Sequence, residues 1–121
     1  MRAPQLVLYG AFTLIGLVFA VASPGHAANE KALEQKKAAD KLRADGKTEE
    51  AIVAYQQVLV LDPEFVEAHH GYQDCMETAG KRKELLDGYR AKVEKNPASA
   101  LLHYLHGRIV TDLAVKEREF K

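Results

Sequence analysis

An internal repeat with a period of 34 residues is the feature that most constrains how this chain folds. Three pairs of residues at this offset carry the repeat: Gly46 with Gly80, Tyr55 with Tyr89, and Pro63 with Pro97. A period of 34 without strand signals is typical of stacked helix-turn-helix units. We therefore predict an all-α fold, an antiparallel helix-turn-helix solenoid with repeats at residues 31–64 and 65–98 and a partial repeat at 99–121.

Each period has the pattern of two amphipathic helices separated by a glycine turn. One apolar stripe precedes the first turn and another follows it: Ala38, Ala39 and Leu42, then Ala51, Ile52, Tyr55, Val58 and Leu59. Gly46 and Gly80 suit the left-handed conformation that closes a helix, because a Cβ is strained there. Pro63 and Pro97 predict the end of the second helix of each pair.

These residues resemble the tetratricopeptide repeat family over nearly all of residues 28–121. The first repeat carries Gly46, Ala51, Tyr55 and the closing Leu61, Asp62 and Pro63. The second carries Tyr72, Met76, Gly80, Leu85, Tyr89, Asn96 and Pro97, and the third begins with Leu102, Leu105, Gly107 and Val110. The resemblance implies that Gly107 lies where two helices approach closely.

Departures from the family pattern predict where packing is weaker. Gln73 and Lys92 replace small residues, which makes the second repeat the poorer match. His69 and His103 stand where the family often has a large apolar residue, so we expect helix packing with a buried hydrogen bond there. From Lys116 onward we expect only a charged stub of a further helix, which either caps the array or marks a truncation.

The amino terminus has the layout of a secretory signal. A single charge, Arg2, precedes an apolar run from Leu6 to Ala22. Pro24 and Gly25 should break the helix and leave an extended segment, which favours cleavage after Ala27. Residues 1–27 are thus predicted to be a signal peptide and residues 28–121 the repeat domain, exported to a bacterial periplasm. The alternative is an uncleaved anchor that tethers the domain to the outer face of the membrane.

The resemblance implies that the first helix of each pair lines a concave groove that holds a peptide or protein partner. The groove residues would be Lys36, Asp40, Arg43, His70, Asp74, Glu77, Tyr104 and Arg108. The alternative interpretation is that these side chains belong to ordinary solvated helix faces. About three repeats are usually needed for a stable stack, so we also expect a partner or a second copy to cover the face of the Leu102–Val115 helix.

Composition narrows the function further. The chain has 17 basic and 17 acidic side chains, which argues against nucleic-acid binding. Its one cysteine, Cys75, is expected to be buried and unreactive. We predict no catalytic residue, metal or cofactor. Together with the signal sequence and the resemblance, this favours an exported non-catalytic adaptor. One alternative is a membrane-anchored or self-associating assembly subunit. Less favoured are a metal-binding module with a ligand pair at His103 and His106 and an enzyme that uses His70, Cys75 and His103.

Overall fold

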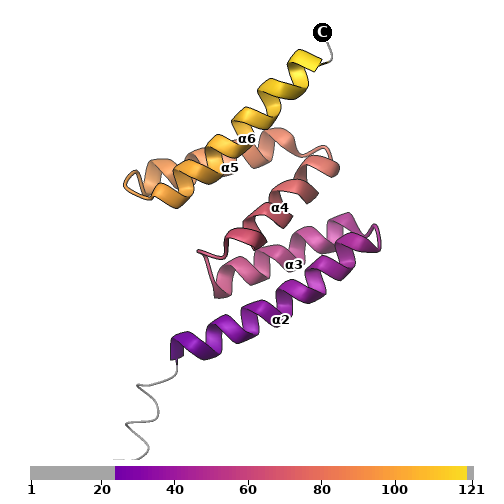
Figure 1. Ribbon diagram of the computed structural model, residues 1–121, viewed down its shortest axis with the longest axis vertical. Coiled ribbons are helices and arrows are strands. Elements are labelled where there is room, and N and C mark those ends of the chain that lie inside the picture. The colour runs from indigo at the N-terminus through magenta and orange to yellow at the C-terminus, as the bar shows by residue number, and fades with distance from the viewer. Residues whose placement is uncertain (1–23, 120–121) are drawn as a thin grey trace, which may run out of the picture.

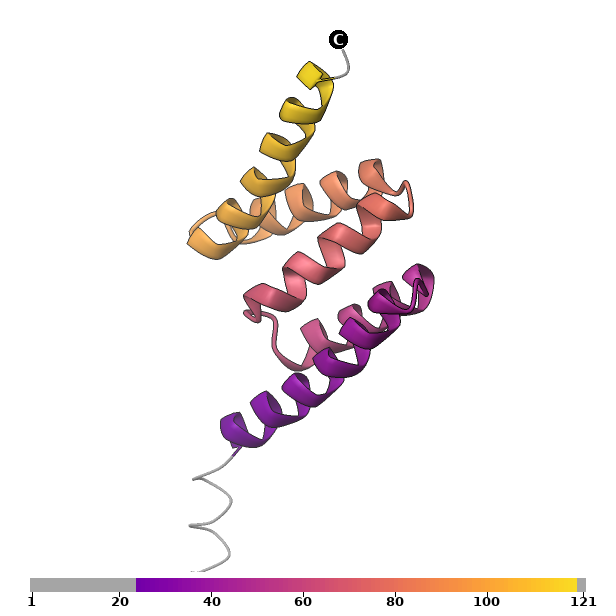
Figure 2. The same ribbon diagram turned by 45° about the vertical axis from the view of Figure 1, so that its right-hand side comes forward.

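The structure is a computed structural model that describes residues 24–119, and within this range it contains five helices and no strand (Figure 1). The helices are α2 (Pro24–Ala44), α3 (Thr48–Leu61), α4 (Val66–Thr78), α5 (Arg82–Lys95) and α6 (Ala100–Glu119). They stack along the long axis, with α2 and α3 at one end, α4 in the middle, and α5 and α6 at the other end (Figure 2). The all-α repeat arrangement predicted from the 34-residue period is therefore confirmed.

The two predicted glycine turns are present. Gly46 and Gly80 have φ angles of 79° and 76°, in the left-handed region that favours glycine. Beyond each glycine, the next backbone N–H returns to the preceding helix: Lys47 donates to the Leu42 carbonyl and Lys81 to the Met76 carbonyl, both at 2.9 Å. This six-residue closure satisfies carbonyls that the helix end would otherwise leave without a partner.

The ends of the helical stack differ from two expectations. The backbone from Pro24 is already helical, so the prediction of an extended segment before Ala27 is wrong. Proline is tolerated in the first turn of a helix, where its missing N–H has no intrahelical acceptor. The apolar run Leu6–Ala22 lies outside the described residues. Among residues 24–119, no helix combines the length and apolar character needed to cross a membrane.

At the other end, α6 continues to Glu119 without the break that we expected near Lys116. Ala114 occupies the position that Gly46 and Gly80 hold in the first two repeats, so nothing closes the helix there. Lys116 instead donates to Glu77 Oε2 at 2.8 Å and ties the extended part of α6 back to α4.

The first helical pair packs more closely than the second, which confirms that the second repeat departs from the pattern. In the first repeat Ala39 is fully buried between α2 and α3, whereas Ala38, which we predicted to share its apolar stripe, is exposed. At the equivalent positions of the second repeat stand the larger Gln73 and Tyr72. Small residues let two helix backbones approach, and larger ones hold them apart. The separation of α4 from α5 follows from this substitution.

Gly71 of α4 lies directly against Tyr55 of α3. A Cβ added to Gly71 would lie 2.6 Å from Tyr55 Cε1 and 2.7 Å from its hydroxyl oxygen. Gly107, for which the resemblance implied such a role, is exposed, and a Cβ there would meet nothing within 4 Å. That expectation is therefore wrong for the described residues.

Candidate partner-binding face

The first helix of each pair contributes to a surface that we call the first-helix face. Its members are the eight residues predicted from the sequence: Lys36, Asp40 and Arg43 on α2, His70, Asp74 and Glu77 on α4, and Tyr104 and Arg108 on α6. Within each repeat these positions are three or four residues apart, a spacing that places side chains on one side of a helix. Each of the eight makes a side-chain contact in the structure, and these contacts form separate groups along the face.

An ion-pair chain joins the three helices of the first-helix face. Arg43 Nη2 donates to Asp74 Oδ2 at 3.0 Å, and Arg108 Nη2 donates to Asp74 Oδ1 at 3.2 Å. One carboxylate on α4 thus receives one arginine from α2 and another from α6. All three side chains are partly exposed, so these ion pairs contribute little to the free energy of unfolding. We assign them a role in positioning the three helices.

Arg108 also connects this chain to the interior. Its Nη1 donates to Gln73 Oε1 at 2.7 Å, and Gln73 Nε2 donates to the Leu105 carbonyl at 3.0 Å. Gln73 is only 1% exposed, and a buried amide is costly unless it is hydrogen-bonded. From the sequence Gln73 was only a departure from the family pattern. Its role as a bridge between α4 and α6 could be seen only once Arg108 was placed beside it.

Near the start of the face, Lys36 Nζ donates to Asp40 Oδ2 at 2.8 Å. The buried Tyr55 hydroxyl donates to the other oxygen, Oδ1, of the same carboxylate. Burial alone would raise the pKa of Asp40, but the hydrogen bonds from Lys36 and Tyr55 outweigh it, and the pKa is lowered. Asp40 therefore stays ionised and cannot serve as a proton donor near neutral pH.

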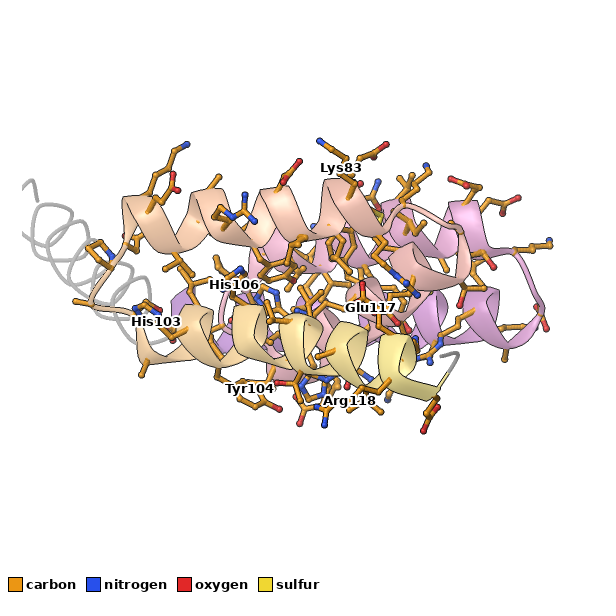
Figure 3. The ribbon with its side chains drawn as sticks, turned by 90° about the horizontal axis from the view of Figure 1, so that it is seen from above. Lys83, His103, Tyr104, His106, Glu117 and Arg118 are labelled. Carbon is orange, nitrogen blue, oxygen red and sulfur yellow. The ribbon has the colours of Figure 1, made fainter. Side chains whose placement is uncertain are left out.

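His70 and Tyr104 form the aromatic contact of the first-helix face. Their Nε2 and hydroxyl oxygen lie 3.1 Å apart, and their ring centroids are 6.0 Å apart. Tyr104 is 51% exposed and lies on the side of α6 away from α5 (Figure 3). Glu77, the remaining predicted residue, is paired with Lys116. Each carboxylate of the face is thus paired with a cation of the chain, and the Tyr104 ring remains exposed.

Two other histidines support the turns between repeats. His69 and His103 are separated by one period, and each places Nε2 2.7 Å from a proline carbonyl, that of Pro63 or Pro97. A carbonyl only accepts, so Nε2 carries the hydrogen in both rings. His69 is buried, as predicted, and its Nδ1 accepts from the Tyr89 hydroxyl at 2.7 Å. The same prediction is wrong for His103, which is exposed. Burial lowers the pKa of His69 and keeps the ring neutral, although the Pro63 carbonyl opposes the effect.

The described residues do not gather into a metal or thiol site. Residues 24–119 contain no group of three or more histidine, cysteine, aspartate or glutamate side chains placed to hold a metal ion. His106 points between α5 and α6 rather than joining His103 (Figure 3). Cys75 is buried, as expected, and burial raises the pKa of its thiol. A thiol in this state is a poor nucleophile.

The fold and this face define a helical-repeat protein whose units are antiparallel helix pairs. In a comparison with protein families, residues 39–71 match the family described as TPR repeat. The matched range runs from the middle of α2 through α3 to the middle of α4. No curated protein matches the chain. The match confirms the resemblance to tetratricopeptide repeats over residues 39–71, and a repeat of this kind suggests a protein–protein interaction scaffold.

Proposed function

We propose that the chain is a non-catalytic adaptor that holds a segment of a protein partner on the first-helix face. The observation that carries this proposal is the continuity of that face across three helices through Arg43, Asp74 and Arg108. A surface that is already fixed by side-chain contacts loses little conformational entropy when a partner binds. Such preorganisation favours recognition of an extended or helical segment.

The chemistry of the face indicates what kind of partner segment fits. Its carboxylates and cations pair within the chain, so a strongly charged partner would have to break these pairs. The exposed Tyr104 ring and the His70 imidazole beside it offer apolar contact together with hydrogen bonding. Tyrosine supplies large contact area at low entropy cost. We therefore expect an uncharged or weakly charged segment with at least one apolar side chain.

Contact with the partner can be tested by photo-crosslinking in the native cell. A photoreactive residue at His70 should give an adduct with a different protein, and one at Gln57 should not, because Gln57 lies on the exposed side of α3. Excess unlabelled His70→Ala protein should compete less well than wild type for the same adduct. Only self-adducts from His70 would overturn the adaptor proposal and favour a self-associating subunit, whereas equal adducts from both positions would show that the contact is nonspecific.

We further propose that the domain is exported and that residues 1–27 are removed. The support is the apolar run Leu6–Ala22 behind Arg2, a pattern of secretory signals. Intact mass measurement of the protein purified from fractionated cells should show a chain that begins at Ala28 and partitions with the soluble extracytoplasmic fraction. A full-length mass in the membrane fraction would instead establish the retained anchor.

A further inference from the structure

A trough that shares no residue with the first-helix face lies between α3 and α5, and residues of α4, α6 and the turns also line it. It consists of two adjoining hollows of about 330 and 240 Å³ that share Leu59 and Lys92. The larger hollow is also lined by Gln56, Val60 and Tyr72. The smaller is also lined by Pro63, His69, Asn96 and Leu102. We call these two hollows together the Lys92 trough.

The trough exists because the second repeat departs from the first. Lys92 stands at the position that Val58 holds in the first repeat, where the valine is fully buried. A lysine ammonium is not buried without a partner, so Lys92 stays exposed and cannot fill the space that a valine would fill. The bulky Tyr72 and Gln73 also keep α4 away from α5. The hollow is therefore specific to this sequence and not to the repeat pattern.

The side chains of the trough combine an apolar floor with one cation. Leu59, Val60 and Tyr72 supply apolar surface, and Val60 is 82% exposed. No carboxylate lines either hollow within residues 24–119. The Lys92 ammonium makes no ion pair in that range and lies over the Tyr89 ring, 5.4 Å from its centroid. Both nitrogens of His69 are already hydrogen-bonded, so the ring offers nothing to a ligand.

We propose that the Lys92 trough binds a short peptide segment in which one carboxylate lies between two apolar side chains. Each hollow would receive one apolar side chain, and the carboxylate would pair with Lys92, the residue that the hollows share. Charge complementarity selects this occupant, since the trough presents an unpaired ammonium and no acid of its own. Asn96, at the edge of the smaller hollow, can donate an amide hydrogen bond to the same carboxylate. This second site is independent of the first-helix face.

The test uses purified protein and fluorescein-labelled peptides with one glutamate between two leucines at several spacings. Fluorescence anisotropy should show binding that weakens with salt, because the central contact is an ion pair. Lys92→Glu should weaken binding by about tenfold or more. Lys95→Glu is the matched control, because it makes the same charge change on an exposed residue of the same helix. Peptides with glutamine in place of glutamate should bind wild type more weakly than the original peptides do, and should lose less than the original peptides lose with Lys92→Glu, which also adds like-charge repulsion.

The apolar hollows are tested by a second matched pair. Val60→Asp places a charge inside the trough at an exposed position, so the protein should stay folded while peptide binding is lost. Val53→Asp, on the same helix but outside both hollows, should bind as wild type does; its side chain is 53% exposed. Amide shift changes in labelled protein should centre on Gln56, Val60 and Asn96.

Three results would overturn the proposal. The first is that none of the peptides binds at about 1 mM, and the second is that Lys92→Glu and Lys95→Glu weaken peptide binding equally. The third is that decanoate binds in the trough and no peptide does, because the site would then belong to a small amphiphile. Photo-crosslinking from His70 in the Lys92→Glu protein separates the two proposals. If this variant gives the normal adduct from His70 but does not bind the peptides, the first-helix face still functions and only binding in the Lys92 trough is lost.

Discussion

Replacing Gly71 by alanine is expected to destabilise the fold by about 3 kcal/mol, which is a large part of the stability of a domain of this size. The added Cβ would lie 2.6 Å from Cε1 of Tyr55, closer than side-chain carbons approach one another. Tyr55 cannot move aside, because its ring is fully buried and its hydroxyl bonds to Asp40. Either α4 shifts away from α3 or the tyrosine leaves its pocket. Urea denaturation followed by circular dichroism measures the change.

Gly88→Ala is the matched control for this prediction. Gly88 lies in α5, and a Cβ there would meet nothing within 4 Å. Alanine is a better helix former than glycine, so the variant should be more stable by about 0.5–1 kcal/mol. Adding Tyr55→Leu to Gly71→Ala should cost less than the sum of the two single changes, because the smaller side chain leaves room for the methyl group. Strict additivity would show that the contact between the two residues is not the cause.

Replacing His69 by leucine is expected to cost about 2 kcal/mol. The side chain is 2% exposed, and both ring nitrogens are hydrogen-bonded, so leucine would leave the Tyr89 hydroxyl and the Pro63 carbonyl without these partners. His103→Leu removes the equivalent bond to Pro97, yet His103 is exposed and water can replace the imidazole. This control should lose less than about 0.5 kcal/mol. If His69→Leu and His103→Leu lost equal stability, the burial of His69 would not be the cause of the loss.

His69 also makes the stability of the fold depend on pH, and the sign of this dependence follows from the direction of its pKa shift. The pKa of folded His69 is lowered from its ordinary value of 6.5, chiefly by burial, so the unfolded chain binds a proton more readily. Stability is therefore full above pH 6.5 and is progressively lost as the pH falls from 6.5 through the folded pKa. The lowered pKa of Asp40 adds a separate loss, which begins only below its ordinary value of 3.8. Urea denaturation between pH 7 and 4.5 should show the first loss in wild type and His103→Leu and not in His69→Leu.

Much of the fold could be predicted from the sequence because repeats and turns are local signals. Gly46 and Gly80 close helices by their own backbone freedom, and Pro63 and Pro97 lie two residues beyond the ends of α3 and α5. The spacing of apolar positions also assigns Ile52, Tyr55 and Val58 to the buried side of α3, whereas Ala38 is exposed on α2. These properties depend on a residue and its near neighbours in the chain.

The remaining features depend on which side chain lies opposite. A glycine at a helix contact has the same sequence signature whether its neighbour is a buried ring, as at Gly71, or solvent, as at Gly107. The period correctly places Asp74 and Arg108 at equivalent positions of successive repeats, but it does not show that their charges meet. For the same reason, the sequence predicted that the eight residues share one face, but it did not predict which of them pair with one another. Whether a partner uses that face stays a prediction.

The close packing of α4 on α3 and its looser packing on α5 have a consequence for folding cooperativity. In a repeat array, stability is a sum of terms within and between neighbouring units, so the weakest interface decides where the chain opens first. Here that interface falls inside the second sequence repeat, and the cohesive units are α2–α3–α4 and α5–α6. The units that fold together are thus offset by one helix from the units that repeat in the sequence. Gln73, Arg108 and Lys116 bridge the two units by polar contacts, and buried apolar side chains of both units belong to one cluster. Added salt should therefore weaken only the ion-paired part of this joint.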